Sequence, residues 1–585
     1  MQTLQAVQLV GGDPLLGRST FTRFILPFSW SLSPCTEAKS GPAFREAAAQ
    51  DWIHAATAAG VNPESVSSPK FLDWARRRYL TEETDGLLFK RAKWFILDEE
   101  QSDGVWKKMT VESNVGVSYD VFLRPPALVL FEMSKALSCT GTDSVFQTGF
   151  LLHEAFFNRD KPPSYFNLLR FNEIFRYIRC PFRDHAVSLS ASELTSMARE
   201  ATGTTARSEL TDWKPDQLDS LYNWRWEKLF SHSVLIQETE YQLRACETKN
   251  EDEARIFPSW LVNPDDRAFT ATFAVLDNQT RSQNDKGPGE LIARSFTAGV
   301  SLSKTGPEGF WVKLLNVDRP KPGDADTLGD ASLFEIAWAN ERTYKRWAEG
   351  SDCTLYGYCE HAAAVLTQAT RGDGRQVPVH GEPELSLHFG QMYFDVTLLL
   401  LYVRVSLFRF SRWLSGISSD ARDGKQDYKE WKRSFDQLHQ DFMLFENLYQ
   451  WPLLSNQQQH LEMYEIQRRS LDIEDLYEEV RREIESSDEL LDREADEELA
   501  EAANRLNWLA ACGLVLSLVL GGAQIYYGSQ TPHPPGNFPQ WNFLNDPAAS
   551  YWWASTLTLL SILVGLFFIF WNIAAKIRRR QRLKQ

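Results

Sequence analysis

Cysteine is scarce in this chain, and basic residues are in deficit. The 585 residues include seven scattered cysteines and no Cys-x-x-Cys pair, which excludes a dense disulfide framework and favours a reduced, cytosolic environment. Sixty-two Lys and Arg against 78 Asp and Glu give a net charge of −16, so we expect no direct nucleic-acid binding. The N-terminus has neither a basic region nor a sustained apolar core, so we expect no signal peptide.

Complete catalytic and metal-binding patterns are also missing. Gly12–Gly17 has the spacing of a phosphate loop, but an arginine stands where that motif requires lysine. The stretch "HEAFF" starts like a zinc-protease motif, but Phe157 replaces the second histidine. Cys353, Cys359 and His361 fit no common zinc spacing, so we interpret the cysteines as core residues. No nucleophile–base arrangement stands out, so we do not expect an enzyme, and no cofactor is certain.

Long apolar runs occur only near the C-terminus. Leu506–Tyr527 and Tyr551–Ala575 contain no charged residue, and both exceed the roughly 20 residues needed to cross a bilayer. Tyr and Trp gather at the ends of both runs, as expected at headgroup depth. We therefore predict two transmembrane helices in the lipid bilayer, with a buried soluble helix as the alternative.

The charges beside these runs predict their orientation. The tail 576–585, "KIRRRQRLKQ", is strongly basic, whereas the loop 528–550 contains no Lys or Arg. Positive charge marks the cytoplasmic side of a membrane. We therefore predict a multi-pass protein of the inner (cytoplasmic) membrane, with both termini in the cytoplasm and only the short loop outside.

A third apolar stretch, Met392–Phe410, is interrupted by charged residues. Asp395, Arg404 and Arg409 fall within it, and only eight residues separate the first two. This spacing is too short for a membrane span. We predict a buried core helix, with a re-entrant segment as the alternative.

The soluble part is predicted to be an α+β domain, because short Phe-, Val- and Leu-rich segments precede a helix. Helical spacing of apolar residues predicts that helix at Ser164–Cys180. Later segments at 333–350 and 355–368 are predicted to be mainly helical. The predicted strands are 21–30, 93–99, 118–124, 127–133, 145–157, 268–277 and 309–317.

The sequence is predicted to divide into seven parts. The division is an N-terminal α+β domain (1–240), a second cytosolic part (241–384), a helical region with a stalk (385–505), the first span (506–527), the outside loop (528–550), the second span (551–575) and the basic tail (576–585).

The stalk is predicted to be one long helix that continues into the first span. From Ile473 to Leu506, apolar or small residues recur every three or four positions, as in a coiled-coil seam. No Pro or Gly occurs from Leu461 to Cys512, and roughly forty residues would extend about 60 Å. The remaining faces are acidic. They are either solvated surface or, across neighbouring stalks, sites for divalent cations.

This layout resembles the CorA family of divalent-cation transporters. The end of the first span reads "IYYGSQ", where that family carries Tyr-Gly-Met-Asn, so Tyr527 and Gly528 match while Ser529 and Gln530 differ. The resemblance covers about 461–585. It implies a funnel-shaped homopentamer with the first span lining the pore, and Mg²⁺ or another divalent cation as the transported ion. The altered outer mouth implies weaker selection for hydrated Mg²⁺. Asp546, the one acid of the outside loop, would form a ring that attracts cations.

The first span carries a small and polar stripe that fits a pore. These residues step by three or four along a helix that is otherwise Leu, Val and Ile, and polar side chains inside a membrane tend to face a pore or a partner helix. Close packing of small residues is the alternative explanation. The stripe consists of Asn507, Ala510, Gly513, Ser517, Gly521, Gln524 and Gly528.

The large cytosolic part and the altered triplet are similar to CorA-like proteins that accompany type III CRISPR antiviral defence. That resemblance implies gating by a nucleotide second messenger. Arginines beside aromatic side chains would hold such a ligand by charge and stacking. Ordinary amphipathic helices explain the same clusters. The candidate residues are Arg176, Arg179, Arg183, Arg342 and Arg346.

Three functions remain open at this point. The first is an oligomeric CorA-like ion channel gated by a small cytosolic ligand. The second is a constitutive Mg²⁺ or divalent-cation transporter. The third is a membrane-anchored binding or scaffold protein without a pore.

Overall fold

A computed structural model describes about half of the chain, in separate segments. With short gaps, these are residues 20–34, 43–48, 77–98, 107–131, 146–176, 232–245, 267–276, 307–317, 333–368, 385–449 and 455–529, together with Trp52 and a few residues between 552 and 563. The chain divides into two compact units, Met1–Arg482 and Glu483–Gln585. The content is α+β with long helices, as the sequence predicts at this coarse level.

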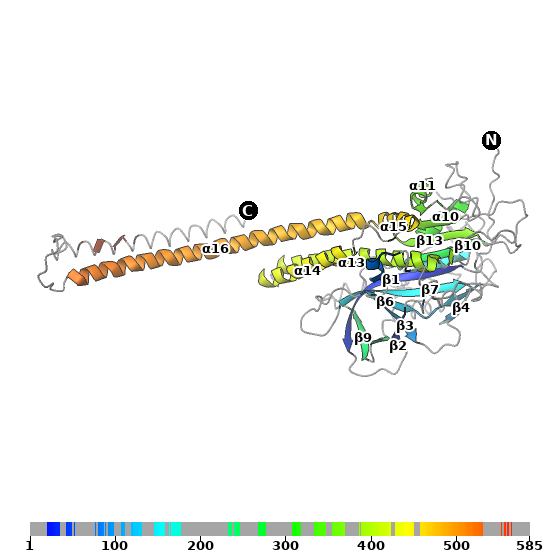
Figure 1. The fold of residues 1–585 in the computed structure, drawn as a ribbon, viewed down its shortest axis with the longest axis horizontal. Coiled ribbons are helices and arrows are strands. Elements are labelled where there is room, and N and C mark those ends of the chain that lie inside the picture. The colour runs from blue at the N-terminus through cyan, green and yellow to red at the C-terminus, as the bar shows by residue number, and fades with distance from the viewer. Residues whose placement is uncertain are drawn as a thin grey trace, which may run out of the picture. The chain divides into compact units, whose positions relative to one another are not determined.

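One large sheet organises the first unit (Figure 1). In the described residues it has thirteen strands, in the order β11-β12-β13-β10-β1-β9-β8-β2-β3-β6-β7-β5-β4, with an additional pairing of β1 with β7. Strands from 1–240 and 241–384 thus share the same sheet. The strands are β1 (Phe21–Pro34), β2 (Ala43–Ala47), β3 (Ala92–Asp98), β4 (Lys107–Val111), β5 (Tyr119–Leu123), β6 (Ala127–Phe131), β7 (Phe146–Phe157), β8 (Ser233–Ile236), β9 (Thr239–Ala245), β10 (Phe269–Leu276), β11 (Thr343–Tyr344), β12 (Leu355–Tyr358) and β13 (Ala362–Gln368).

The central strand β1 exchanges partners along one edge. Phe21–Ile25 pairs with β10, Trp30–Pro34 pairs with β9, and Phe21–Ser31 pairs with β7 on the other edge. Pro27 lies between the β10 and β9 pairings, where its missing N–H costs no ladder bond on that edge. This position explains how a proline is tolerated inside a long central strand.

Alternation along β1 divides the core into two layers. Phe24 faces α4 (Tyr165–Arg176), with its ring 4.5 Å from that of Phe175. Arg23 faces the opposite side, where its guanidinium lies 4.5 Å from the ring centre of Phe394. Helices therefore cover both faces of the central strands.

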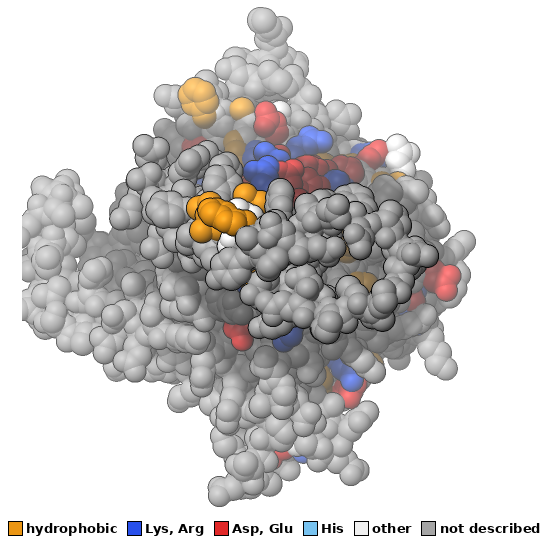
Figure 2. Space-filling model, turned by 90° about the vertical axis from the view of Figure 1, so that its left-hand side faces the viewer, with side chains coloured by type: hydrophobic (Ala, Val, Ile, Leu, Met, Phe, Trp, Pro, Cys, Tyr) orange, Lys and Arg blue, Asp and Glu red, His pale blue; other side chains and the backbone are white. Residues whose placement is uncertain are grey.

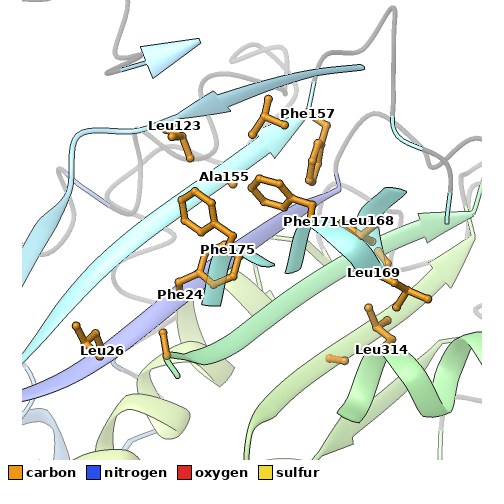
Figure 3. Close-up of a cluster of buried hydrophobic side chains, with 14 of the residues drawn as sticks. Phe24, Leu26, Leu123, Ala155, Phe157, Leu168, Leu169, Phe171, Phe175 and Leu314 are labelled. Atoms are coloured by element: carbon orange, nitrogen blue, oxygen red, sulfur yellow. The ribbon is translucent and has the colours of Figure 1, made fainter. Parts of the chain in front are cut away.

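The α4 layer contains a cluster of fully buried aromatic and aliphatic side chains (Figure 3). Phe171 of α4 meets Phe157 of β7 edge-on at 5.6 Å and stacks on Phe175 at 5.0 Å. Burying each such side chain contributes about 1.5–3 kcal/mol. The helical spacing predicted for Ser164–Cys180 therefore corresponds to a buried helix, α4.

The segment predicted as a strand at 309–317 is instead α10 (Pro307–Asn316). Phe310, Trp311, Leu314 and Leu315 are all at most 2% exposed. Their spacing places them on one side of a helix, and a proline at the first helical position favours helix initiation. A short apolar segment is compatible with either a strand or a helix, and the packing of these four side chains favours the helix.

The helices predicted at 333–350 and 355–368 are also partly wrong. Among the described residues of these segments, only α11 (Leu333–Glu341) is helical, and β11 begins two residues after it. Leu355–Gln368 forms the antiparallel hairpin β12–β13, whose second strand pairs in parallel with β10. At Gly357, a Cβ would lie 2.6 Å from Leu315 and from Trp311. Tertiary pairing against β10 and α10 therefore overrides the helix propensity of the three consecutive alanines.

The stretch Met392–Phe410 is a buried core helix, as predicted. A π-helical turn, η7 (Phe389–Tyr393), leads into α13 (Phe394–Arg422). The three charges inside the stretch are accommodated within the protein: Asp395 is 1% exposed, Arg404 pairs with Glu360, and Arg409 donates to Thr148. Charged side chains can be buried in a protein when they have partners, and these contacts therefore fit a helix in the protein core.

Long helices complete the described chain. After α14 (Tyr428–Tyr449) and α15 (Gln458–Ser470), α16 runs unbroken from Ile473 to Ser529. Asp472, with a φ of 51°, separates α15 from α16. The predicted seam of α16 is buried at Val480, Ile484 and Leu491. A short helix, α3 (Glu82–Asp85), lies earlier in the chain.

Candidate functional site

The C-terminal half of α16 is apolar and exposed. Ile473–Gly522 is long and apolar enough to cross a membrane, and none of its most apolar segment is buried. The exposed leucines alternate with small residues, and water would solvate such a surface poorly. This surface is the described part of the chain that is compatible with a bilayer. The exposed fractions are Leu506 66%, Leu509 63%, Leu514 62%, Leu516 63%, Leu518 45% and Leu520 58%.

Most of the predicted stripe lies on the open side of this helix. Asn507, Gly513 and Ser517 are exposed, whereas Gly521 is half-buried. The Ser517 hydroxyl donates to the backbone oxygen of Leu514 within the helix. Gln524 and Gly528 continue the helical backbone of α16 in the same register.

The opposite side of α16 is partly covered. Successive residues of a helix are turned by about 100°, so Val515 and Ser517 point about 200° apart. Half-buried residues recur at helical spacing on the Val515 side, whereas the stripe follows Ser517. The helix thus has a partly covered side and an open side, which carries most of the stripe together with exposed leucines. The half-buried residues are Trp508, Ala511, Val515, Val519 and Gly522, together with Gly521 of the stripe.

The predicted outer mouth is described only in part. Tyr527, Gly528 and Ser529 form the last turn of α16. Gln530, Asp546 and most of the second predicted span lie outside the described residues. Trp552, the first described residue of that span, is 72% exposed.

The candidate ligand-binding arginines are spread over several elements. Arg176 ends α4 and is buried, and Arg342 follows α11 with its guanidinium 4.7 Å from the ring centre of Trp338. Both lower the pKa of the Cys359 thiol, yet burial dominates and raises that pKa to about 11. Arg346 is half exposed and points to a different partner, Glu462. Arg179 and Arg183 lie outside the described residues.

Glu462 connects the sheet edge to α15, a contact that sequence patterns did not reveal. Its carboxylate accepts hydrogen bonds from the Tyr344 hydroxyl at 2.6 Å and from Gln458 at 2.8 Å, and lies 3.7 Å from Arg346. Burial, then the Glu462 hydrogen bond, raises the pKa of Tyr344 to about 12. Glu462 is one acid among many on a polar helix, so only the fold distinguishes it.

A different face of α15 carries a buried aromatic and amide cluster. The His460 ring stacks on Tyr393 of η7 at 5.1 Å, and Gln459 donates to the Tyr393 hydroxyl at 2.7 Å. Gln467 accepts from Thr397 of α13 at 2.8 Å. Burial, with a further contribution from His388, lowers the pKa of His460 to about 4. These contacts attach α15, the helix directly before α16, to the core helix and the sheet.

Metal ligands are not gathered anywhere in the described part of a single chain. No group of three or more His, Cys, Asp or Glu side chains is arranged to hold a metal ion within the described residues. The stalk acids instead form i,i+4 pairs with arginines, such as Glu489 with Arg493 at 3.4 Å and Glu501 with Arg505 at 3.8 Å. A cation site between neighbouring stalks stays a prediction.

The acidic and basic side chains that Figure 2 shows on one face lie next to one another, so the described part of that face has no large area of one charge sign.

Comparison of the chain with protein-family models, curated proteins and solved structures finds no match.

Proposed function

We propose that this chain is one subunit of an oligomeric ion channel of CorA type, gated by a small ligand of its cytosolic part. The observation that carries the proposal is the exposure of Asn507, Gly513 and Ser517 of the stripe on α16, opposite the partly covered side at Val515. In an oligomer, such stripes would line a common axis, while the leucines would contact lipid.

The architecture proposed for the whole protein is a homopentamer with two spans per subunit, in the inner membrane, with both termini in the cytoplasm. The basic tail after 575 and the uncharged-to-acidic outside loop support this orientation. The altered residues Ser529 and Gln530 favour a less selective cation pore over a dedicated Mg²⁺ transporter. A nucleotide second messenger in antiviral defence is the proposed ligand class.

The contacts of α15 support gating through the cytosolic part. Tyr344 and Arg346 at the sheet edge both engage Glu462 on α15, and only Leu471 and Asp472 separate α15 from α16. A ligand that rearranged the sheet edge would act on α15 and so on the pore helix. Such coupling requires that the ligand bind the two arrangements with different affinity.

The test places cysteines on the two sides of α16. In a Cys512→Ala background, Ser517→Cys is expected to make ion flux through liposomes sensitive to a small cationic thiol reagent. Val515→Cys, about 200° away, is the matched control and is expected to be insensitive. Equal block of both variants, or block of neither in a conducting protein, would contradict the assignment of the stripe to the pore.

The alternatives predict different outcomes of the same preparation. A particle mass near five times 67.1 kDa in detergent supports the pentamer, whereas a monomer or dimer without flux supports a membrane-anchored scaffold. Flux that needs no ligand, together with rescue of a magnesium-starved strain that lacks its transporters, supports a constitutive Mg²⁺ transporter.

A further inference from the structure

A small cleft opens beside β1 where the strand changes partners. The edge of β1 between its β10 and β9 pairings includes Pro27, which forms part of the cleft wall together with Phe269 of β10. Leu401, Val405 and other side chains of α13 form the opposite wall. The interrupted ladder therefore leaves room between the sheet and its core helix.

Charged side chains from three places meet in this cleft. Arg404 of α13 donates through Nη2 to Glu360 Oε1 at 2.5 Å and through Nη1 to the Glu360 backbone oxygen at 3.2 Å. His361 Nε2 lies 3.9 Å from the second carboxylate oxygen of Glu360. Arg267, just before β10, also lines the cleft. Two arginines and one carboxylate thus line the cleft.

Arg404 has donors that Glu360 does not use. Its side chain is 10% exposed, and its Nε makes no hydrogen bond within the described part of the chain. A buried charged donor is normally satisfied. The enclosed part of the cleft has a volume of about 20 Å³, which is enough for one water molecule or one oxygen of a larger group.

The carboxylate that neutralises Arg404 is partly exposed. The Glu360 side chain is 48% exposed and lies in the turn between β12 and β13. It holds the guanidinium through a single side-chain oxygen, whereas an arginine can hold an oxyanion with two parallel donors. An external anion therefore has a better geometry available than the internal one.

We propose that this cleft is a binding site for a small oxyanion, a phosphate or carboxylate group, held by Arg404, Arg267 and His361 after Glu360 swings aside. The site is independent of the proposed channel activity, because it is defined by binding to the cytosolic part. A ligand there would connect the β12–β13 turn to α13.

Thermal unfolding of the full chain in detergent tests this proposal. Sodium phosphate, sodium acetate and sodium chloride are compared at equal ionic strength and pH. A saturable rise in Tm with phosphate, alone or with acetate, that exceeds the chloride response supports the site. A response to phosphate alone assigns a phosphate group, and a response to both assigns oxyanions in general.

Two variants and a control sharpen the result. Arg267→Gln is expected to weaken phosphate binding about tenfold, because a charged donor is lost. Glu360→Gln is expected to tighten it by roughly three- to tenfold, because the competing negative charge is removed. A merely structural ion pair would not produce this gain. Arg409→Gln, on the same helix but bonded to Thr148 outside the cleft lining, is expected to leave phosphate binding unchanged.

Three outcomes would overturn the site. They are equal responses to chloride and phosphate, a phosphate affinity that neither Arg267→Gln nor Glu360→Gln changes, and a loss in Arg409→Gln as large as that in Arg267→Gln. If Glu360→Gln does not fold, the comparison of Arg267→Gln with Arg409→Gln decides the question by itself.

Discussion

Replacing Glu154 with Gln is expected to destabilise the cytosolic unit more than any other single charge removal at the centre of the sheet. Glu154 accepts from Arg23 Nε at 2.7 Å, and its other oxygen lies 2.9 Å from Arg124 Nε. All three side chains are at most 4% exposed. Arg23 also donates to the Gly390 backbone oxygen and lies over the rings of Phe21, Trp52 and Phe394.

The magnitude follows from the charges left behind. Glu154→Gln leaves two buried guanidinium groups without an anion between them, and breaking a buried pair costs about 3–5 kcal/mol. Arg124→Met is the informative comparison. Burial lowers the pKa of Arg124 to about 10 despite the nearby Glu154, so its charge is poorly stabilised, and Glu154 keeps Arg23 as partner. We expect this second variant to cost less than about 2 kcal/mol.

Urea unfolding of both variants, followed by near-ultraviolet circular dichroism, measures the difference. A folded domain is typically stable by about 5–15 kcal/mol, so Glu154→Gln removes a large fraction of the free energy of unfolding. The reasoning is refuted if Arg124→Met is as destabilising as Glu154→Gln, or if both lie within about 0.5 kcal/mol of the wild type, the range of ordinary surface changes.

Two further predictions concern packing and pH. Gly357→Ala is expected to cost about 1–3 kcal/mol through overpacking against Leu315 and Trp311; Gly86→Ala, with no atom within 4 Å, is the control, and equal losses in melts of the two would exclude the clash. For His460, the folded-state pKa of about 4 lies below the ordinary 6.5 because burial disfavours the cation. Stability is therefore full above about pH 6.5 and falls toward pH 4, by about 3 kcal/mol. His460→Phe should flatten this decline in urea unfolding at pH 7 and 4.5, and an unchanged pH dependence would contradict it.

Sequence patterns predicted the correct element where apolar residues followed a single strand-like or helical spacing. Alternating or continuous apolar runs predicted β1, β3, β5, β6, β7 and β10, and helical spacing predicted α4. The charges within Met392–Phe410 predicted a helix in the protein core rather than a membrane span, because buried arginines need partners. An unbroken α16 followed from the absence of Pro and Gly between Leu461 and Cys512.

The errors occurred where neighbours in space decided the structure. The segment 309–317 was predicted to be a strand and is a helix, whereas 355–368 was predicted to be helical and is a hairpin. The two segments are in contact at Gly357. The short, mostly apolar segment 309–317 is compatible with a strand or a helix. The alanine run suits a strand that is buried on both faces between β10 and β12. No single window of sequence contains this information.

The candidate site divides in the same way. The stripe from Asn507 to Gly528, its exposed leucines and the basic tail are periodic or compositional, so the sequence alone determined a helix able to enter a membrane with one polar side. Tertiary structure decided which polar and charged side chains meet: Glu154 between two arginines, Glu462 between Tyr344 and Arg346, and Glu360 on Arg404. The reason is physical. Helical periodicity depends on residues three or four positions apart, whereas these contacts join residues 30 to 131 positions apart through a sheet whose order no local pattern specifies.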